Sequence, residues 1–280
     1  MQFVAPLSYL LLVSTIPLVT CAAHSKCEVG TGEGQALALQ APLDPVPAPA
    51  PVEAPTLGTE QGVASWQSSC PSAMILVDGD YCTEVRETCL QWDEPPEQTR
   101  FARCATFAPS VCVGNRVHKR FCIDRDEYVR SGDSLPLSNV SWMQARTICQ
   151  KDGKRLCSET EWEFACEGEE MLPYPTGYER DSTVCNFDKK ELIDPQTGKL
   201  RDLREPPAEL GGCKSPFGVR SMTGNVDEWV WRDRTSGEWR SALKGGWWMP
   251  ARDRCRPATT AHGENFGGLQ TGFRCCADAP

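Results

Sequence analysis

The segment KGGWWMPARDRCRP, residues 244–257, gathers residue types that carry chemistry in proteins. Cys255 stands between two arginines, and neighbouring positive charge lowers the pKa of a thiol and so favours the reactive thiolate. Trp247 and Trp248 are adjacent, and tryptophan and arginine are both enriched in binding sites. The segment therefore raises two alternatives, a reactive cysteine or a stretch that serves structure and binding.

The overall cysteine content bears on how that thiol is interpreted. The chain of 280 residues contains sixteen cysteines but only three histidines, His24, His118 and His262, and it has no CxxC pair. Structural zinc sites need closely spaced cysteine and histidine ligands. Disulfides are therefore the favoured interpretation, and they indicate an oxidising compartment.

Charge and the N-terminal residues bear on partners and location. The net charge of −9 and the pI of about 5.0 argue against nucleic acid as a partner. Residues 1–22 are apolar and uncharged through Val19, which predicts a signal peptide and an exported protein. LVTC, residues 18–21, resembles a lipobox with Cys21 as the lipidated residue. A lipid anchor in the cell envelope and free secretion remain alternatives, and that anchor is the only membrane contact we expect.

The next section changes in composition at Cys70. Residues 23–69 are rich in alanine and proline and have almost no aromatic residues, so we expect a disordered, semi-rigid linker. Residues 70–280 carry fourteen of the cysteines and most of the aromatic residues. They predict one disulfide-rich domain.

Regular structure in that domain is predicted to be sparse. Residues 74–81 resemble a strand that ends in a turn. Ser141 with Gln144, and Ser158 with Glu161, have the spacing of capping boxes that open two short helices. Glycine, proline and asparagine are frequent afterwards, so the pattern indicates an α+β domain with much loop.

Several motifs together resemble the formylglycine-generating enzyme, or sulfatase-modifying factor, family. In order along residues 70–277 they are MILVDGDY, RFCIDRDEY, the two capped helices, GVRSMTGNVDEW, LKGGWW, RCR and GFRCC. The resemblance implies a C-type-lectin-like variant of the α+β fold, with little regular secondary structure. It also implies the disulfides Cys149–Cys275 and Cys166–Cys255.

The remaining cysteines are less constrained by the resemblance. Cys157 with Cys276, and Cys185 with Cys213, are suggested pairs. The pairing among six further cysteines is left open: Cys70, Cys82, Cys89, Cys104, Cys112 and Cys122.

The resemblance also argues against the family's known metal chemistry. The active enzyme oxidises a cysteine of a sulfatase with oxygen and a copper ion held by two cysteines, but residues 249–254 contain no cysteine. A second branch uses iron held by three histidines that come largely from an attached helical domain, whereas here only His118 and His262 lie in the domain. We therefore expect neither copper nor iron, and we assign no catalytic residue.

Calcium is the cofactor that the resemblance leaves open. One implied site consists of Ser221, the carbonyls of Gly224 and Val226, and Glu228, and a second begins with Asn186 and the carbonyl of Phe187. The alternative for Asn225, Asp227 and Glu228 is a turn with a solvated face.

The resemblance further implies a groove. Its floor would be Trp247 and Trp248, its rim Arg252 and Arg256, and its wall the TTAHGENF segment with His262 and Glu264. Such a groove suits an extended peptide or a glycan. In the alternative, both tryptophans pack in the core, and the arginines pair with Asp253 and Glu264.

Two functions of different class follow. The first is an exported binding or assembly module without thiol–copper catalysis, for an extracytoplasmic protein, peptide or glycan. The second is a catalytic relative that modifies an extracytoplasmic substrate through a site around His262.

Overall fold

The structure is a computed structural model that describes residues 70–99, 102–234 and 238–280. The predicted signal peptide, the lipidation site Cys21 and the Ala/Pro-rich linker lie outside these residues. The elements are β1 (Met74–Cys82), β2 (Val85–Arg86), β3 (Cys89–Glu94), β4 (Arg103–Phe107), β5 (Val111–Cys112), β6 (Arg116–Asp124), α1 (Trp142–Lys151), β7 (Arg155–Leu156), α2 (Glu159–Glu167), β8 (Asp227–Trp231), β9 (Ser241–Lys244), β10 (Ala258–Thr259), β11 (Thr271–Gly272) and β12 (Cys275–Asp278).

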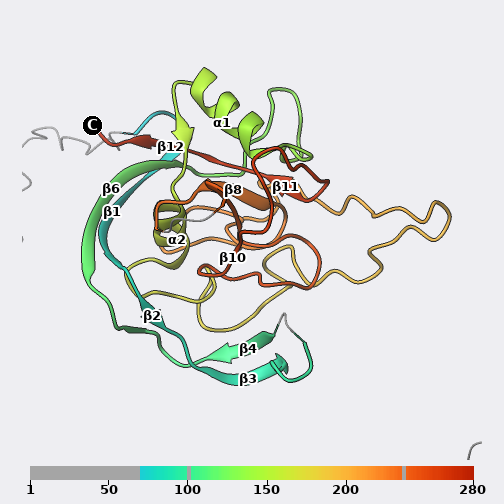
Figure 1. The fold of residues 1–280 in the computed structure, drawn as a ribbon, viewed down its shortest axis with the longest axis horizontal. Coiled ribbons are helices and arrows are strands. Elements are labelled where there is room, and N and C mark those ends of the chain that lie inside the picture. The colour runs from blue at the N-terminus through green and yellow to red at the C-terminus, as the bar shows by residue number, and fades with distance from the viewer. Residues whose placement is uncertain (1–69, 100–101, 235–237) are drawn as a thin grey trace, which may run out of the picture. The chain divides into compact units, whose positions relative to one another are not determined.

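Two four-stranded sheets organise the described residues. The first has the order β1-β6-β12-β7, and its β1 and β6 pair antiparallel from Met74–Asp124 to Cys82–Arg116, as the long curved ribbon of Figure 1. The second has the order β10-β9-β8-β11, in which β11 runs parallel to β8. The pairs β2-β5 and β3-β4 form two small sheets within the segment that connects β1 to β6.

Both predicted capping boxes open a helix. The Ser141 and Ser158 side chains accept from the backbone N–H three residues on, and the Gln144 and Glu161 side chains accept from the cap N–H groups in return. Helix α2 ends at Gly168, whose φ of 67° suits a residue without a side chain. The predicted α+β class with little regular structure is confirmed.

Two hydrophobic clusters form most of the core. One packs α2, through Trp162 and Phe164, against strands of both sheets. The other packs α1, through Trp142, against Trp229 and Phe273. The two helices thus fix the second sheet, which carries the candidate site.

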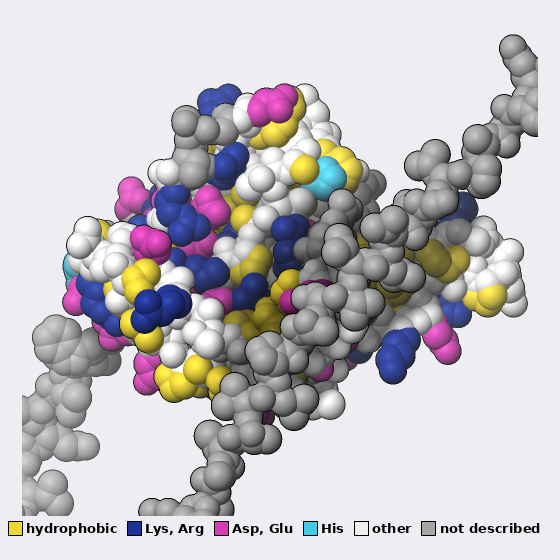
Figure 2. Space-filling view, turned by 60° about the horizontal axis from the view of Figure 1, so that its bottom comes forward, with side chains coloured by type: hydrophobic (Ala, Val, Ile, Leu, Met, Phe, Trp, Pro, Cys, Tyr) yellow, Lys and Arg dark blue, Asp and Glu magenta, His cyan; other side chains and the backbone are white. Residues whose placement is uncertain are grey.

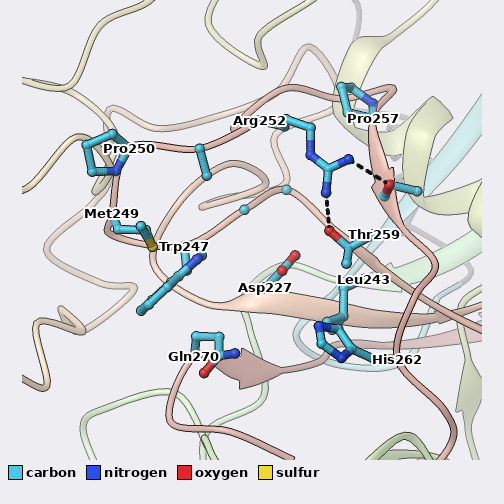
Figure 3. Close-up of a pocket in the computed structure, with 14 residues that line it drawn as sticks. Asp227, Leu243, Trp247, Met249, Pro250, Arg252, Pro257, Thr259, His262 and Gln270 are labelled. Atoms are coloured by element: carbon cyan, nitrogen blue, oxygen red, sulfur yellow. Dashed lines mark hydrogen bonds between the residues drawn. The ribbon is translucent and has the colours of Figure 1, made fainter. Parts of the chain in front are cut away.

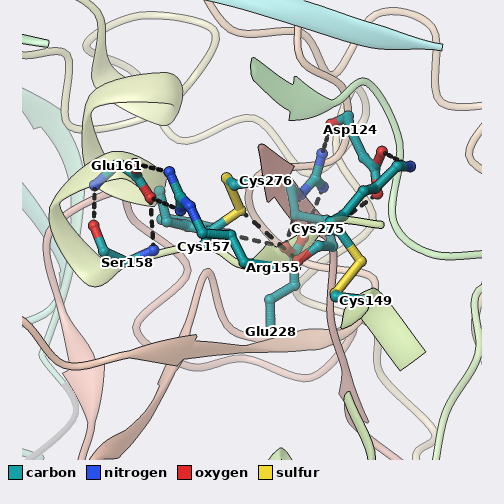
Figure 4. Close-up of a disulfide and its surroundings, with 12 residues drawn as sticks. Asp124, Cys149, Arg155, Cys157, Ser158, Glu161, Glu228, Cys275 and Cys276 are labelled. Carbon is teal, nitrogen blue, oxygen red and sulfur yellow. Dashed lines mark hydrogen bonds and ion pairs between the residues drawn. A yellow bond between two sulfur atoms is a disulfide. The ribbon is translucent and has the colours of Figure 1, made fainter. Parts of the chain in front are cut away.

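Seven disulfides cross-link these elements and the loops between them. They are Cys70–Cys122, Cys82–Cys112, Cys89–Cys104, Cys149–Cys275, Cys157–Cys276, Cys166–Cys255 and Cys185–Cys213. The four pairs implied or suggested by the sequence are all formed. Adjacent Cys275 and Cys276 point to opposite faces of β12 because strand side chains alternate, so they reach different partners (Figure 4).

Charged side chains of both signs are mixed on the face that Figure 2 shows. Lys and Arg side chains there lie interspersed with Asp and Glu side chains (Figure 2). None of the helices in the described ranges has the length and hydrophobicity that a membrane crossing requires.

Candidate functional site

A cavity of about 220 Å³ opens at one end of the second sheet, beside the loop that follows β9. Figure 3 shows the lining side chains converging from β8, β9, β10, this loop and the segment before β11. Its lining consists of Asp227, Leu243, Gly245, Gly246, Trp247, Met249, Pro250, Ala251, Arg252, Pro257, Ala258, Thr259, His262 and Gln270.

Asp227 supplies a carboxylate to this cavity. It is the first residue of β8, lies opposite Thr271 of β11, and its N–H donates to the Gln270 carbonyl at 2.8 Å. The Gly246 N–H acts on its side chain and favours the ionised form. Burial, reinforced by the negative charge of Asp253, raises the pKa of Asp227 to about 7, against the smaller opposing effects of that N–H and of Arg252.

Two glycines shape the loop beneath the tryptophan. Gly245 and Gly246 have φ of 87° and 74°, in the left-handed region that side chains disfavour. A Cβ on Gly245 would lie 2.6 Å from the Met222 carbonyl oxygen, and one on Gly246 would overlap Asp253 Oδ1. The Gly-Gly pair therefore allows the backbone of this loop to pass close to Met222 and Asp253.

The opposite wall is held by Arg252 and His262. The Arg252 guanidinium donates to the Ala258 carbonyl at 3.4 Å and to Thr259 Oγ1 at 2.5 Å, which ties the loop to β10. The His262 ring stacks on Phe266 with centroids 3.9 Å apart. Three of the six expected groove residues, Trp247, Arg252 and His262, thus meet around this cavity.

The other three expected groove residues lie elsewhere. Trp248 is fully buried and packs edge-on against Trp247, with ring centroids 4.9 Å apart. Arg256 forms a bidentate pair with buried Glu167 and lines a different cavity. Glu264 pairs with Arg240 at 3.2 Å. Because Trp248 lies in the core while Trp247 lines the cavity, the two tryptophans do not form one floor.

The alternative pairing of the arginines is also corrected. Asp253 pairs with Arg180, at 2.5 Å, rather than with an arginine of its own segment. Its second oxygen, Oδ1, has no hydrogen-bond partner. Burial raises the pKa of Asp253 to about 7, and Arg180 opposes that rise.

A buried ionic cluster lies behind the site. Lys244, the last residue of β9, donates to Glu163 at 2.7 Å, and both side chains are fully buried. Glu163 also accepts from Arg234. Burial lowers the pKa of Lys244, and Glu163 opposes this shift. The cluster ties α2 to the strand that enters the site.

The cysteine of the opening segment is structural. Cys255 is joined to Cys166 at the end of α2. Every cysteine from Cys70 to Cys276 lies in a disulfide, so residues 70–280 hold no free thiol. The reactive-thiolate alternative is therefore wrong for Cys255.

The expected calcium ligands fit a cation unevenly. The Glu228 carboxylate already accepts two hydrogen bonds from Arg274, each of 2.7 Å, and one from Trp162 of 2.9 Å. Asn186 Oδ1 and Ser221 Oγ, in contrast, are buried without a hydrogen-bond partner. These two oxygens fit a hard cation, whereas Glu228 does not. The carbonyl donors expected at Gly224, Val226 and Phe187 lie on the same stretches of chain.

Asp227 is the site residue that the sequence interpretation missed. Asn225, Asp227 and Glu228 are all buried, so the alternative of a solvated face is wrong. A signal was present, because Asp227 and Trp229 are two residues apart and therefore share one face of a strand. An acid beside a buried tryptophan on that face is unusual enough to mark a site.

The sequence was compared with known proteins. Residues 83–279 match the family model of the sulfatase-modifying factor enzyme 1-like domain. "Inactive C-alpha-formylglycine-generating enzyme 2" of Bos taurus is 29% identical over 167 residues, or 54% of this chain and 53% of that protein. "Formylglycine-generating enzyme" of Thermomonospora curvata is 28% identical over 170 residues, or 51% of this chain and 55% of that protein.

A longer relative and a solved structure are also similar to this chain. "Serine/threonine-protein kinase pkn1" of Chlamydia caviae is 31% identical over 161 residues, which are 50% of this chain but 24% of the kinase. The chain thus spans from about a quarter to about half of these curated relatives. The solved structure of CarF shares the fold, with a TM-score of 0.50 and 16% identity over 75% of this chain and 99% of CarF.

Proposed function

This chain belongs to the sulfatase-modifying factor enzyme 1-like family, and from that premise we propose that it is an exported binding module without thiol–copper catalysis. The ligand site is the cavity lined by Trp247, Arg252 and His262, and the ligand is part of an extracytoplasmic protein, peptide or glycan. As part of the same proposal, we assign the fold to the C-type-lectin-like variant.

The observation that carries the proposal is the state of the cysteines. Copper(I) sites use thiolate or thioether ligands. All fourteen cysteines of residues 70–280 are paired, and Met249 is the only sulfur ligand among the residues that line the cavity. A single thioether does not replace two thiolates. Seven disulfides also support the oxidising compartment that export provides.

Thiol mapping tests the chemistry. The purified, oxidised protein is unfolded with denaturant, without a reducing agent, and alkylated. Peptide mapping then locates the labelled cysteines and separates Cys21 and Cys27 from the rest. We expect no label from Cys70 onward. The same preparation, loaded with copper(I), is given a cysteine-containing peptide and oxygen uptake is followed. Two labelled thiols near the cavity together with copper-dependent oxygen uptake would overturn the proposal.

Cavity occupation tests the binding role. An array of random peptides and a glycan array are probed with the wild-type protein and with the Trp247→Ala variant. We expect retained ligands whose signal the variant loses, since Trp247 supplies aromatic surface to the cavity. Ligands retained equally by both proteins would place binding outside the cavity.

Calcium is a separate part of the proposal. We place a weakly bound ion at one or both of the two expected sites, and the burial of Ser221 Oγ in the first and of Asn186 Oδ1 in the second without hydrogen-bond partners supports this. Metal analysis of the purified protein should then find calcium, and removal by a chelator should lower thermal stability.

A further inference from the structure

In the part of the chain that the structure describes, buried carboxylates are paired with cations, with two exceptions. Among the described residues, eight acidic side chains are buried, and six of them form an ion pair with Lys or Arg. These six are Asp124, Glu159, Glu163, Glu167, Glu228 and Asp253. The two acids for which no ion pair is present are Glu127 and Asp227.

The two exceptions have different surroundings. Glu127 is satisfied from within the core, because it accepts from Asn225 Nδ2 at 2.6 Å and from the Val226 N–H at 3.1 Å. The carboxylate of Asp227 faces the open cavity, and the Gly246 N–H favours its ionised form (Figure 3). A buried charge without a counter-ion is unfavourable. The cavity is where a counter-ion for Asp227 can enter.

The charged groups around Asp227 do not take that place. Arg252 lines the same cavity but donates to Ala258 and Thr259 of β10. Asp253, the nearest acid, is held by Arg180. Glu228 is held by Arg274, and His262 stacks on Phe266 across the cavity. Since no described residue forms an ion pair with Asp227, we look to a ligand for the pairing cation.

The walls of the cavity fit a cation on an apolar stem. Leu243, Trp247, Met249 and Pro250 offer apolar surface, and the tryptophan ring also attracts cations. The Gly246 N–H already stabilises the ionised carboxylate, so the compact point charge of an ammonium suits the site better than the two-pronged guanidinium. Arg252 favours the ionised form of Asp227 through its charge, but its hydrogen bonds go to β10, so the carboxylate remains available to one cation of a ligand.

We propose that Asp227 anchors the ammonium group of a lysine side chain, presented by an extracytoplasmic protein or peptide. The stem of that lysine packs against Trp247, and its ammonium replaces the missing counter-ion of Asp227. The inference rests on the proposed binding function, because it names the ligand that the cavity takes.

Matched peptides and matched variants test the inference. Acetyl- and amide-capped peptides, identical except for one central lysine, norleucine or arginine, are titrated into the protein by calorimetry at pH 8, with cadaverine as the free-amine arm. Flanking residues are taken from peptides that bind in the array. Asp227→Asn removes the charge at the cavity, and Glu127→Gln removes the other unpaired buried charge as a control. Melting curves establish that each variant is folded.

The expected pattern is specific. Lysine binds more tightly than norleucine, arginine and cadaverine, and Asp227→Asn weakens the lysine peptide by about tenfold or more, as for a charge-assisted hydrogen bond. The norleucine peptide is unaffected by that substitution, and Glu127→Gln changes neither affinity.

The contrary outcomes separate the two proposals. Equal affinity for lysine and norleucine, tighter binding of arginine or cadaverine, or an unchanged affinity in folded Asp227→Asn would overturn the lysine assignment. If Trp247→Ala still abolished binding in those cases, the binding function would stand. Should no array ligand depend on Trp247, both proposals would be refuted.

Discussion

Replacement of Gly246 by alanine tests how the site is built. The residue has φ of 74°, and a Cβ there would lie 3.0 Å from Asp253 Cγ and closer still to Oδ1. Asp253 cannot withdraw freely, because its other oxygen accepts from Arg180 at 2.5 Å and from the Ala251 N–H at 3.1 Å. The substitution therefore combines backbone strain with overpacking.

The two contributions can be separated with Gly198→Ala. Gly198 has φ of 66° but no atom within 4 Å of an added Cβ. Left-handed backbone costs alanine about 1–2 kcal/mol at either position. Overpacking against Asp253 adds about 1–3 kcal/mol at Gly246 alone. The reduced entropy of the unfolded chain, which favours alanine, is common to both variants and cancels in the comparison.

Guanidinium chloride unfolding with the disulfides intact measures both variants. We expect Gly246→Ala to lose about 1–3 kcal/mol more than Gly198→Ala. In an Asp253→Ala background the extra loss should disappear, because the obstructing carboxylate is gone. Equal losses in the two single variants, or an extra loss that persists without Asp253, would refute the reasoning.

Three further perturbations address charge and metal. Glu163→Gln leaves fully buried Lys244 without its counter-ion, so we expect a loss of about 3–5 kcal/mol in chemical denaturation. Lys244→Met should lower the unfolding free energy by less than Glu163→Gln, because Glu163 still forms its ion pair with Arg234. A larger loss for Lys244→Met would contradict this explanation. The folded pKa of Asp227, about 7, lies above its ordinary value, so its stabilising contribution is present below pH 4 and is lost as pH rises towards 7. The unfolding free energy is measured from pH 4 to pH 8 for the wild type and for Asp227→Asn. Its total fall over this range should be larger for the wild type by up to about 4 kcal/mol. Parallel curves would exclude the raised pKa of Asp227. Calcium at ten times its dissociation constant should raise the unfolding free energy by about 1.4 kcal/mol. The substitution Asn186→Ala should remove that gain. Identical melting curves with calcium and with a chelator would exclude the site.

Local sequence rules were sufficient to place the two helices of the scaffold. Capping boxes at Ser141 and Ser158 act through residues three positions away, so sequence alone places both helix starts. The family resemblance supplied the long-range pairings Cys149–Cys275 and Cys166–Cys255, which no local rule can give. The six N-terminal cysteines could not be paired in advance, because their partners depend on the register of β1 with β6 and on two small sheets.

The candidate site was only half predictable for a related reason. Trp247 and Trp248 look equivalent in sequence, yet the turn at Gly245 and Gly246 sends one ring to the cavity and the other into the core. Arg256 and Glu264 were expected at a groove, but each found a partner far away in the chain, Glu167 and Arg240. Such partners are set by tertiary packing, which composition and spacing do not encode.

The disulfide at Cys255 and the carboxylate at Asp227 together define what this site can do. Because Cys255 is fixed to Cys166, the loop from Gly245 to Cys255 is anchored at its end without offering a thiol. Asp253 lies next to Gly246, close to this anchor. In the proposed binding role, this loop presents Trp247 and Asp227 to a cation of the ligand. Loosening the anchor, by replacing Cys166 and Cys255 together, should therefore weaken lysine binding even though neither cysteine touches the cavity.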